Sequence, residues 1–471
     1  MANFSTVLSS NYSSIGITSS TKVYDTPETL PLTNLIEGEM VFVTSTNRFY
    51  ISNGTGWNSI KLLTELNGTD WQLQFTLDNP NAFGTSASDN FGGYASSKGD
   101  YLVVTAYVED ETDNTNSGKA YVFDNTTGSL LRTIDNPNAY STPANDRFGD
   151  GVSVSDSYIA ISASNETAYA GKVYIFSIST GSLLLTISNP NPSNYQTFTS
   201  FGARNGVAIS DLYLLVGAPG EDNNSASQRS SGKLYIYTLG AGGTSASIRT
   251  VNNPNPYGTV EYDYFGAAVA ISGTYAIASA YGEDTASGTN SGKVYIFDAT
   301  TGSLIRTLSN PNAYGTEVDD FFGYSIKVHG NYLAVGTFED DSSGNNSGKV
   351  YIYDITNGAL VHTLNNPNPY GTSTDDQFGI DVAISDKYIA VGARYEDEAS
   401  GVNSGKVYIF SVSTGNLLFT LDNPNAYSTP TSDSFGSVIT INGDYIIVSA
   451  SIEDDSDGLD SGKVYIFKAI A

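Results

Sequence analysis

The chain has 471 residues, of which 49 are acidic, 21 are basic and none is cysteine, so its formal net charge is −28. This charge repels nucleic-acid phosphates and anionic lipids, so we expect neither nucleic-acid binding nor membrane insertion. The lack of cysteine excludes disulfides and thiolate metal sites. No apolar stretch approaches the ~18 residues that a membrane-spanning helix needs.

The first segment, residues 1–28, is rich in Ser, Thr and Asn and has no core-forming pattern. This composition predicts a flexible N-terminal arm. The segment also lacks the basic start and apolar run of a signal peptide, so we expect no such signal. Residues 29–69 contain two strand-like runs, MVFVTST (Met40–Thr46) and RFYISNG (Arg48–Gly54), and the ending GTGWNSI. These runs predict a small β module.

This module resembles short modules in structural proteins of marine tailed phages, especially cyanophages, over Leu30–Ile60. The resemblance implies that residues 29–69 are an attachment or oligomerisation module, through which the chain docks to other virion proteins or forms a homo-oligomer. It also implies a location in the virion, on a tail or another appendage.

From residue 70 onward the sequence repeats itself seven times. Each copy carries an Asn-Pro pair, a Phe-Gly pair and a stretch related to SGKVYIF, and consecutive Phe-Gly pairs are 53 to 64 residues apart. A fixed period of this size is typical of solenoids, propellers and arrays. The seven phenylalanines are Phe91, Phe148, Phe201, Phe265, Phe322, Phe378 and Phe435.

Each copy predicts four strands. In the sixth copy they are Phe378–Ser385, Lys387–Ala393, Gly405–Phe410 and Gly415–Leu421. The third strand is apolar on both faces, which indicates burial between neighbouring sheets. Because SGK leads into a strand rather than a helix, its glycine indicates a structural position and not a phosphate loop. Four strands in each of seven copies predict an all-β, seven-bladed β-propeller over residues 70–471.

The two ends of the repeat region complement each other. After Phe467 the chain has no fourth strand for the seventh copy, whereas Trp71–Leu77 matches that strand and precedes the first copy. We therefore expect this N-terminal strand to complete the last blade. Closure of the ring in this way removes the open sheet edge that a linear array would leave.

The sequence of motifs Phe-Gly, VAIS and YIAVGA resembles the FG-GAP repeats of integrin α-subunit heads and bacterial surface proteins. The third copy carries the Gly-Ala-Pro outright in VGAPGED (Val216–Asp222). The resemblance extends over all seven copies, from Trp71 to Phe467. It implies a seven-bladed propeller that is used mostly for binding.

Acidic pairs recur in the loop before SGK. Integrin repeats often hold calcium between their first two strands, but that turn is too short in this sequence. Only EDDSDG (Glu453–Gly458) alternates its acids as a calcium loop does, which makes Glu453, Asp455 and Asp457 the candidate Ca²⁺ ligands. The favoured alternative is solvated acids on one negative face and no cofactor. The pairs are Glu109–Asp110, Glu221–Asp222, Glu283–Asp284, Glu339–Asp340, Glu396–Asp397 and Glu453–Asp454.

An aromatic residue follows most Asn-Pro motifs. Such residues could form a rim that stacks on sugar rings or contacts a partner, or they could fill the gap between neighbouring blades, which is the interpretation we favour. They are Phe83, Tyr140, Tyr257, Tyr314, Tyr370 and Tyr427.

No catalytic residue is expected. The two histidines, His329 and His362, fall on different predicted strands, and no nucleophile motif accompanies them. The leading hypothesis is a non-enzymatic phage virion protein whose propeller forms a binding head for a host surface glycan or protein. The alternatives are an extracellular bacterial adhesion protein and, less favoured, a glycan-active enzyme.

Overall fold

The computed structural model describes residues 22–24, 30–31, 40–43, 48–52, 57–60, 70–81, 88–110, 116–138, 145–191, 199–222, 230–255, 261–286, 288–312, 318–341, 346–368, 374–397, 403–425, 432–454 and 460–470. The chain divides into two compact units, Met1–Asp70 with Ala469–Ala471, and Trp71–Lys468. Within the described ranges no helix has the length and apolar character to cross a bilayer.

The N-terminal unit contains one four-stranded sheet in the order β1-β2-β3-β4. β1 runs parallel to β2, and the other neighbours are antiparallel. β1 lies within residues 1–28, the segment that was expected to be a flexible arm. A strand of mixed polarity can be ordered by backbone hydrogen bonds to its neighbour without an apolar pattern of its own. The strands are β1 (Lys22–Tyr24), β2 (Met40–Val43), β3 (Arg48–Ser52) and β4 (Trp57–Ile60).

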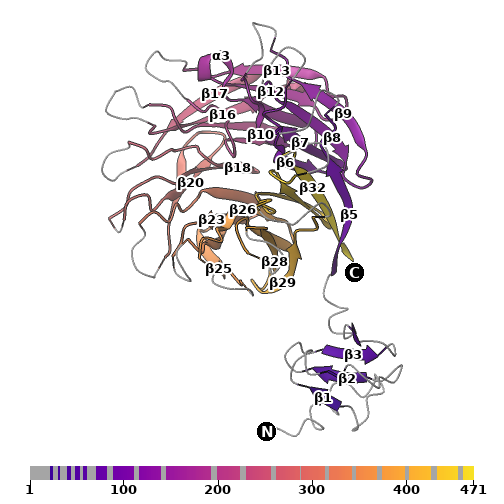
Figure 1. The fold of residues 1–471 in the computed structure, drawn as a ribbon. Coiled ribbons are helices and arrows are strands. Elements are labelled where there is room, and N and C mark those ends of the chain that lie inside the picture. The colour runs from indigo at the N-terminus through magenta and orange to yellow at the C-terminus, as the bar shows by residue number, and fades with distance from the viewer. Residues whose placement is uncertain are drawn as a thin grey trace. The chain divides into compact units, whose positions relative to one another are not determined.

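The second unit is a ring of seven four-stranded sheets (Figure 1), which confirms the predicted propeller. Blade 1 contains β6 (Phe91–Lys98), β7 (Tyr101–Ala106), β8 (Lys119–Asp124) and β9 (Leu130–Asp135). Blade 2 contains β10 (Phe148–Val154), β11 (Tyr158–Ala163), the short helix α3 (Glu166–Tyr169), β12 (Lys172–Ser177) and β13 (Leu183–Ser188). Blade 3 contains β14 (Val207–Ile209), β15 (Tyr213–Ala218), β16 (Lys233–Leu239), the 3-10 turn η3 (Ala241–Gly243) and β17 (Ala246–Asn252).

The remaining blades follow the same plan. Blade 4 contains β18 (Val269–Ser272), β19 (Tyr275–Ala280), β20 (Lys293–Asp298) and β21 (Leu304–Ser309). Blade 5 contains β22 (Ser325–His329), β23 (Tyr332–Thr337), β24 (Lys349–Asp354) and β25 (Ala359–Asn365). Blade 6 contains β26 (Phe378–Ile384), β27 (Tyr388–Ala393), β28 (Lys406–Ser411) and β29 (Leu417–Asp422). Blade 7 contains β30 (Val438–Asn442), β31 (Tyr445–Ala450), β32 (Lys463–Ile470) and β5 (Asp70–Asp78).

The ring closes as predicted, because β5 is the outer strand of blade 7 and lies next to β32. The Lys463 ammonium also contacts the Asp78 carboxylate across this junction. Leu77 is buried in a cluster with Phe91, Tyr121 and Ile466, so the closing strand contributes to the core of the ring as well as to its hydrogen bonding.

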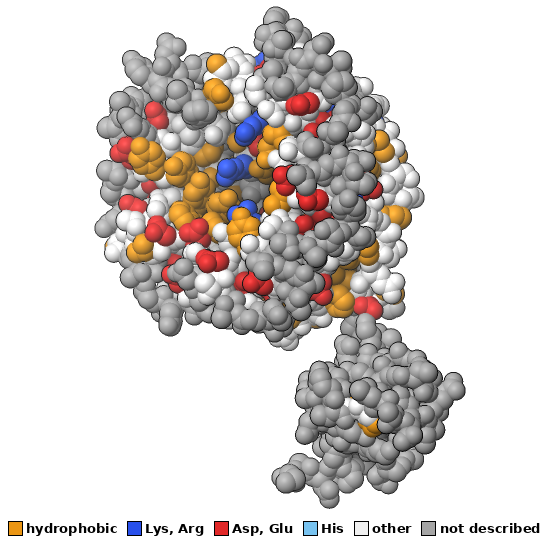
Figure 2. All heavy atoms as spheres, viewed as in Figure 1, with side chains coloured by type: hydrophobic (Ala, Val, Ile, Leu, Met, Phe, Trp, Pro, Cys, Tyr) orange, Lys and Arg blue, Asp and Glu red, His pale blue; other side chains and the backbone are white. Residues whose placement is uncertain are grey.

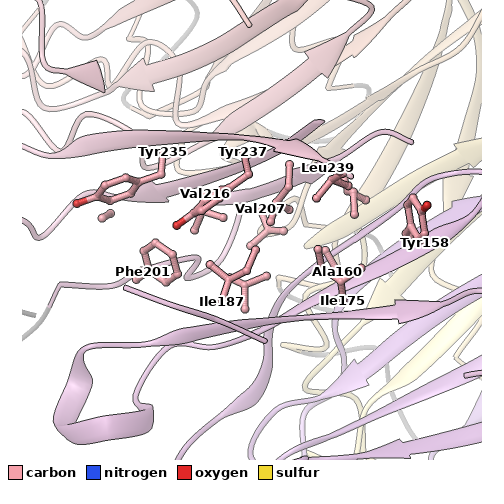
Figure 3. Packing of buried hydrophobic residues seen from close by; sticks show 14 residues of the cluster. Tyr158, Ala160, Ile175, Ile187, Phe201, Val207, Val216, Tyr235, Tyr237 and Leu239 are labelled. Carbon is pink, nitrogen blue, oxygen red and sulfur yellow. The ribbon is translucent and has the colours of Figure 1, made fainter. Parts of the chain in front are cut away.

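The third strand of each blade is buried on both faces. In β28, Val407, Tyr408 and Ile409 have no exposed surface and Phe410 is 4% exposed, in agreement with the apolar run in the sequence. The core consists of layers between adjacent blades. Figure 3 shows one such layer, in which Ile187 of blade 2 lies opposite Val207 and Val216 of blade 3.

The repeated Phe-Gly and SGK motifs meet at the junction between blades. All seven Phe-Gly phenylalanines are fully buried. At the blade 6–7 junction the Phe435 amide donates to the Ser404 carbonyl at 3.2 Å, and Gly405 has a φ of +82°. A Cβ atom on Gly405 would lie 2.2 Å from the Phe435 oxygen, so only glycine fits at this position.

Candidate functional site

Glu453 of the predicted calcium loop is fully buried. Its two carboxylate oxygens accept hydrogen bonds from the Tyr465 hydroxyl at 2.7 and 2.8 Å. Burial raises the pKa of Glu453 to about 7, and the Tyr465 hydrogen bond opposes that shift. Asp455 and Asp457 lie outside the described residues. Within the described part of the chain, no group of three or more potential ligand side chains is placed to hold a metal ion.

A buried carboxylate bonded to the tyrosine of the third strand occurs in all seven blades. The expectation of solvated acids is therefore wrong for the first acid of each pair, because a phenol hydroxyl inside the blade satisfies it. In blade 5 this acid is Asp340, so the equivalent pair is Asp340–Asp341 and not Glu339–Asp340. The bonds are Tyr121–Glu109, Tyr174–Glu166, Tyr235–Glu221, Tyr295–Glu283, Tyr351–Asp340, Tyr408–Glu396 and Tyr465–Glu453.

A second buried carboxylate fixes the Asn-Pro-Asn segment. In blade 1, Asn79 and Asn81 donate side-chain hydrogen bonds to Asp89 at 2.8 and 2.6 Å, and burial raises the pKa of Asp89 to about 6. Thr199 replaces this acid before blade 3, and Asn191 donates to Glu221 instead. These repeated acids therefore have a structural role. The equivalents of Asp89 are Asp146, Asp263, Asp320, Asp376 and Asp433.

The predicted aromatic rim, Phe83, Tyr140, Tyr257, Tyr314, Tyr370 and Tyr427, lies outside the described residues. The two histidines are on the first and last strands of blade 5. His329 Nε2 lies 3.0 Å from Asp386, and His362 Nε2 lies 2.9 Å from the Val412 carbonyl oxygen. The structure therefore does not bring them together in one site.

One end of the ring axis opens into a cavity of about 770 Å³, which we call the axial funnel. It is formed where the first strand of each blade begins and the second strand ends. A second cavity, of about 520 Å³, lies at the other end of the axis and shares Ala95, Val152, Val207 and Lys327 with the funnel. The funnel is lined by residues of all seven blades, including Tyr94, Asp150, Arg204, Ala267, Tyr324, Asp381 and Ser437.

Four cations line the funnel, and we call them the cationic arc: Arg147, Arg204, Lys327 and Arg394. Figure 2 shows Lys and Arg side chains gathered at the hollow in the centre of this face, with hydrophobic side chains around them and acidic side chains further out. The Arg204 side chain makes no hydrogen bond to any residue in the described ranges. The arc therefore presents positive charge in a chain whose overall charge is −28.

Two carboxylates lie among these cations. Asp150 accepts a hydrogen bond from the Ser164 hydroxyl, and burial raises its pKa while the charges of Arg147 and Arg204 lower it. Asp381 is 5% exposed, and its Oδ2 atom accepts the Ile439 amide at 2.8 Å. Its Oδ1 atom has no hydrogen-bond partner among the described residues. Burial raises the pKa of Asp381 as well, with Lys327 as the opposing charge.

Blades 4 and 5 supply a continuous aromatic surface, which we call the aromatic wall: Tyr264, Tyr281, Phe321, Tyr324 and Phe338. Tyr264 and Tyr281 are stacked with their ring centroids 5.3 Å apart, and Tyr281 is 5.5 Å from Tyr324. Phe321 and Phe338 support these rings, with centroid distances of 5.9 Å between Tyr281 and Phe321 and 4.4 Å between Tyr324 and Phe338. Burial raises the pKa of Tyr281 to about 12, so its hydroxyl is neutral at physiological pH.

Arg204 lies on a segment that distinguishes blade 3 from the others. Three residues lie between Phe148 and Val152, where the regular pairing of β10 resumes, whereas five lie between Phe201 and the equivalent Val207. The two additional residues form a turn in which Arg204 has a φ of +56°. A left-handed arginine costs about 1–2 kcal/mol relative to a regular conformation. The insertion therefore places a cation at the funnel at some expense of stability.

The same conformation recurs before every Phe-Gly pair. This position has a φ of 53° to 57° in each blade, although only blade 1 uses asparagine, the residue best suited to it. Blades 2 and 4 place Arg147 and Tyr264 there, and both side chains line the funnel. Bulky side chains in a strained conformation are typical of functional surfaces. The residues at this position are Asn90, Arg147, Ser200, Tyr264, Phe321, Gln377 and Ser434.

Our sequence-based reasoning did not identify the funnel residues, although the sequence contains a signal for them. The two-residue combination after Phe-Gly is different in each copy, whereas the motifs around it are repeated. In blade 1 these residues are Gly93 and Tyr94, and in blade 6 they are Ile380 and Asp381. Positions that break the repeat mark the surface where the blades are not equivalent.

Comparison with known families identifies the repeated unit. The FG-GAP repeat family matches residues 82–123, 256–297, 313–353, 369–410 and 426–467, which correspond to blades 1, 4, 5, 6 and 7. No curated protein matches the chain. Blades 2 and 3 are the two without a match, and they carry Asp150 and the inserted turn with Arg204. FG-GAP propellers are typically binding folds without enzymatic activity, and this chain carries FG-GAP repeats in five blades of a seven-bladed ring that its own N-terminal strand closes.

Proposed function

We propose that the protein is a non-enzymatic binding protein whose ligand enters the axial funnel. One observation supports this proposal: the residues that line the funnel differ from blade to blade, whereas the motifs elsewhere in each blade are repeated. The cationic arc comes from blades 2, 3, 5 and 6 and the aromatic wall from blades 4 and 5, so together they form a single site rather than seven repeated ones. A concave surface with aromatic rings and a few convergent polar groups is typical of ligand sites.

The location that we propose is a phage particle, with residues 1–69 as the attachment region. Two observations support this proposal: the resemblance of GTGWNSI to modules of cyanophage structural proteins, and the separation of the N-terminal sheet from the propeller as its own compact unit. In this arrangement the propeller is a head that displays the funnel. The alternative is a bacterial adhesion protein with the same propeller.

The location is tested on particles purified from the phage that encodes the chain. We expect mass spectrometry of gradient-purified virions to detect the protein at a constant ratio to the major capsid protein. Antibodies to the propeller should label one appendage in electron micrographs. Absence from intact particles, together with presence on a bacterial surface, would favour the alternative.

The funnel is tested separately with the full chain. Fluorescently labelled protein should bind the surface of host cells, and the Arg204→Gln substitution should weaken that binding. Lys98→Gln provides a matched control, because Lys98 lies at the opposite end of the axis and forms an exposed ion pair with Asp156. Equal binding by the two variants would contradict a role for the funnel.

A glycan-active enzyme is a second candidate, because Asp150 and Asp381 are two funnel carboxylates with raised pKa values. Paired carboxyl groups in a sugar-binding site perform glycoside hydrolysis. The test is release of reducing ends from polysaccharides by the full chain. Activity that is lost in Asp150→Asn or Asp381→Asn would establish the enzyme, and stable binding without cleavage would establish the binding head.

A further inference from the structure

We infer that the axial funnel binds an acidic oligosaccharide: the aromatic wall receives a pyranose ring, and the cationic arc receives its carboxylate or sulfate. This inference rests on the proposed function of the funnel as a ligand site and names the chemistry of the ligand. It uses three features that lie together in one cavity: flat aromatic faces, four cations against two carboxylates, and hydrogen-bond acceptors.

The aromatic wall provides the surface for the sugar ring. Three of its members, Tyr264, Tyr281 and Tyr324, line the cavity, and Phe321 and Phe338 pack behind them. Aromatic faces carry negative charge density and attract the weakly positive C–H groups on one face of a pyranose. The rings are held by contacts with one another, so the wall is organised before a ligand arrives.

The cationic arc provides the selection for negative charge. The Arg204 guanidinium is exposed at the funnel and makes no hydrogen bond to a described residue. By contrast, Arg394 donates to Gln377 at 2.8 Å and lies 4.6 Å from the centroid of the Tyr395 ring. Arg204 therefore keeps its five donors for an incoming anion, and a planar guanidinium suits a carboxylate or a sulfate.

The two carboxylates distinguish a saccharide from an acidic peptide. Asp150 and Asp381 accept hydrogen bonds, and Oδ1 of Asp381 has no partner among the described residues. Sugar hydroxyls can donate to such acceptors, whereas the ionised side chains of an acidic peptide only accept hydrogen bonds. Acidic residues further out on this face also repel dense polyanions, which favours a ligand with spaced charges (Figure 2).

The experiment measures binding of the full chain to three soluble probes by isothermal titration calorimetry. The probes are short galacturonate oligosaccharides, the same oligosaccharides with their carboxyl groups reduced to alcohols, and oligoglutamate of equal charge. A parallel array of uronate-, sialate- and sulfate-bearing oligosaccharides covers other acidic sugars. We expect at least one acidic oligosaccharide to bind at least about tenfold more tightly than its neutral counterpart and than the peptide.

Two funnel variants and two controls locate the site. Arg204→Gln should lower affinity for the acidic oligosaccharide by about 10- to 100-fold and leave affinity for the neutral one unchanged. Tyr281→Ala should lower affinity for both. Lys98→Gln and Tyr332→Ala should change neither, because these residues are exposed and lie near the opposite end of the axis. If Tyr281→Ala lowers the melting temperature substantially, Lys327→Gln serves as the second funnel variant.

Several results would overturn the inference while leaving a binding head in place. These are preference for the neutral sugar, equal binding of oligoglutamate, or an Arg204→Gln protein that binds the acidic sugar as tightly as the native one. If the protein binds no acidic sugar on the array but still binds host cells in an Arg204-dependent way, the funnel has a different ligand. Loss of both would reject the proposed function itself.

Discussion

Removing the Tyr465 hydroxyl should destabilise the propeller, and the loss should depend on pH. The hydroxyl is the hydrogen-bond donor to the Glu453 carboxylate, which is fully buried. A hydrogen bond to a charged group contributes about 1.5–3 kcal/mol, and one between neutral groups about 0.5–1.5 kcal/mol. Because the pKa of Glu453 is about 7, the larger loss applies at pH 8.5 and the smaller at pH 5.

These energies convert to a measurable shift of melting temperature. The entropy of unfolding is about 2.1 cal/mol/K per residue, or about 0.8 kcal/mol/K for a propeller of this size. Tyr465→Phe should therefore lower the melting temperature by about 2–4 °C at pH 8.5 and by about 1–2 °C at pH 5. Differential scanning calorimetry and urea unfolding on the full chain measure both quantities.

A matched control exists in the same blade. Tyr445 is half-buried, and its hydroxyl makes no hydrogen bond to a described residue, so Tyr445→Phe should change stability little at either pH. The double substitution Tyr465→Phe with Glu453→Gln should cost less than the two single losses combined, because both remove the same bond. A Tyr465→Phe protein as stable as Tyr445→Phe at pH 8.5 would refute the buried acid–tyrosine pair as a source of stability.

Four further predictions concern pH, glycine, ring closure and salt. Burial raises the pKa of seven carboxyl groups: to about 6 for Asp89, Asp320, Asp376 and Asp433, and to about 7 for Glu109, Asp263 and Glu453. The folded state therefore binds more protons than the unfolded state between about pH 4 and 7. The contribution of these groups is therefore complete below their unfolded pKa and is lost as pH rises through 7, and the melting temperature should fall from pH 5 to pH 8. Gly405→Ala should cost more than about 2 kcal/mol, whereas Gly443→Ala, at a φ of +60° with open space around it, should cost about 1 kcal/mol in chemical denaturation. Deleting Met1–Leu77 should open blade 7 and lower the melting temperature, and deleting only Met1–Asn67 should not; equal melting of both with the full chain would contradict closure by β5. Raising sodium chloride from very low levels should stabilise the acidic ring, and calcium at constant ionic strength should add nothing; a calcium-specific rise that Asp455→Ala and Asp457→Ala abolish would restore the metal site.

The sequence predicted the propeller because its architecture is repeated. Seven copies of the apolar third strand and of Phe-Gly specify the blade, and the missing strand after Phe467 specifies the closure. The acids were misinterpreted because a Glu-Asp pair looks the same in the sequence whether its first acid is solvated or is buried and bonded to a tyrosine hydroxyl. The information that separates these cases is the tyrosine in the third strand, which recurs in all seven copies and was assigned only to the core.

The funnel was harder to predict for a physical reason. Its residues come from positions with no shared pattern, and they meet only because the ring brings seven strand ends to one axis. Arg204 and Tyr281 are 77 residues apart in the chain. An alignment of the seven copies reveals the variable positions and the two-residue insertion, but the geometry of the ring is needed to show that they line one cavity.

Ring closure also sets a condition on how the protein is made. β5 is synthesised first among the propeller strands, whereas Lys463, which contacts Asp78, follows it by 385 residues. At about 5–20 residues per second, a ribosome needs about 20–80 s to cover that distance. During this interval six blades can assemble, but β5 and the face of blade 1 that packs on blade 7 still lack the strands of blade 7. Nascent or truncated chains therefore expose a sheet edge that the finished ring hides, and resistance to proteolysis should appear only after the last strand leaves the ribosome.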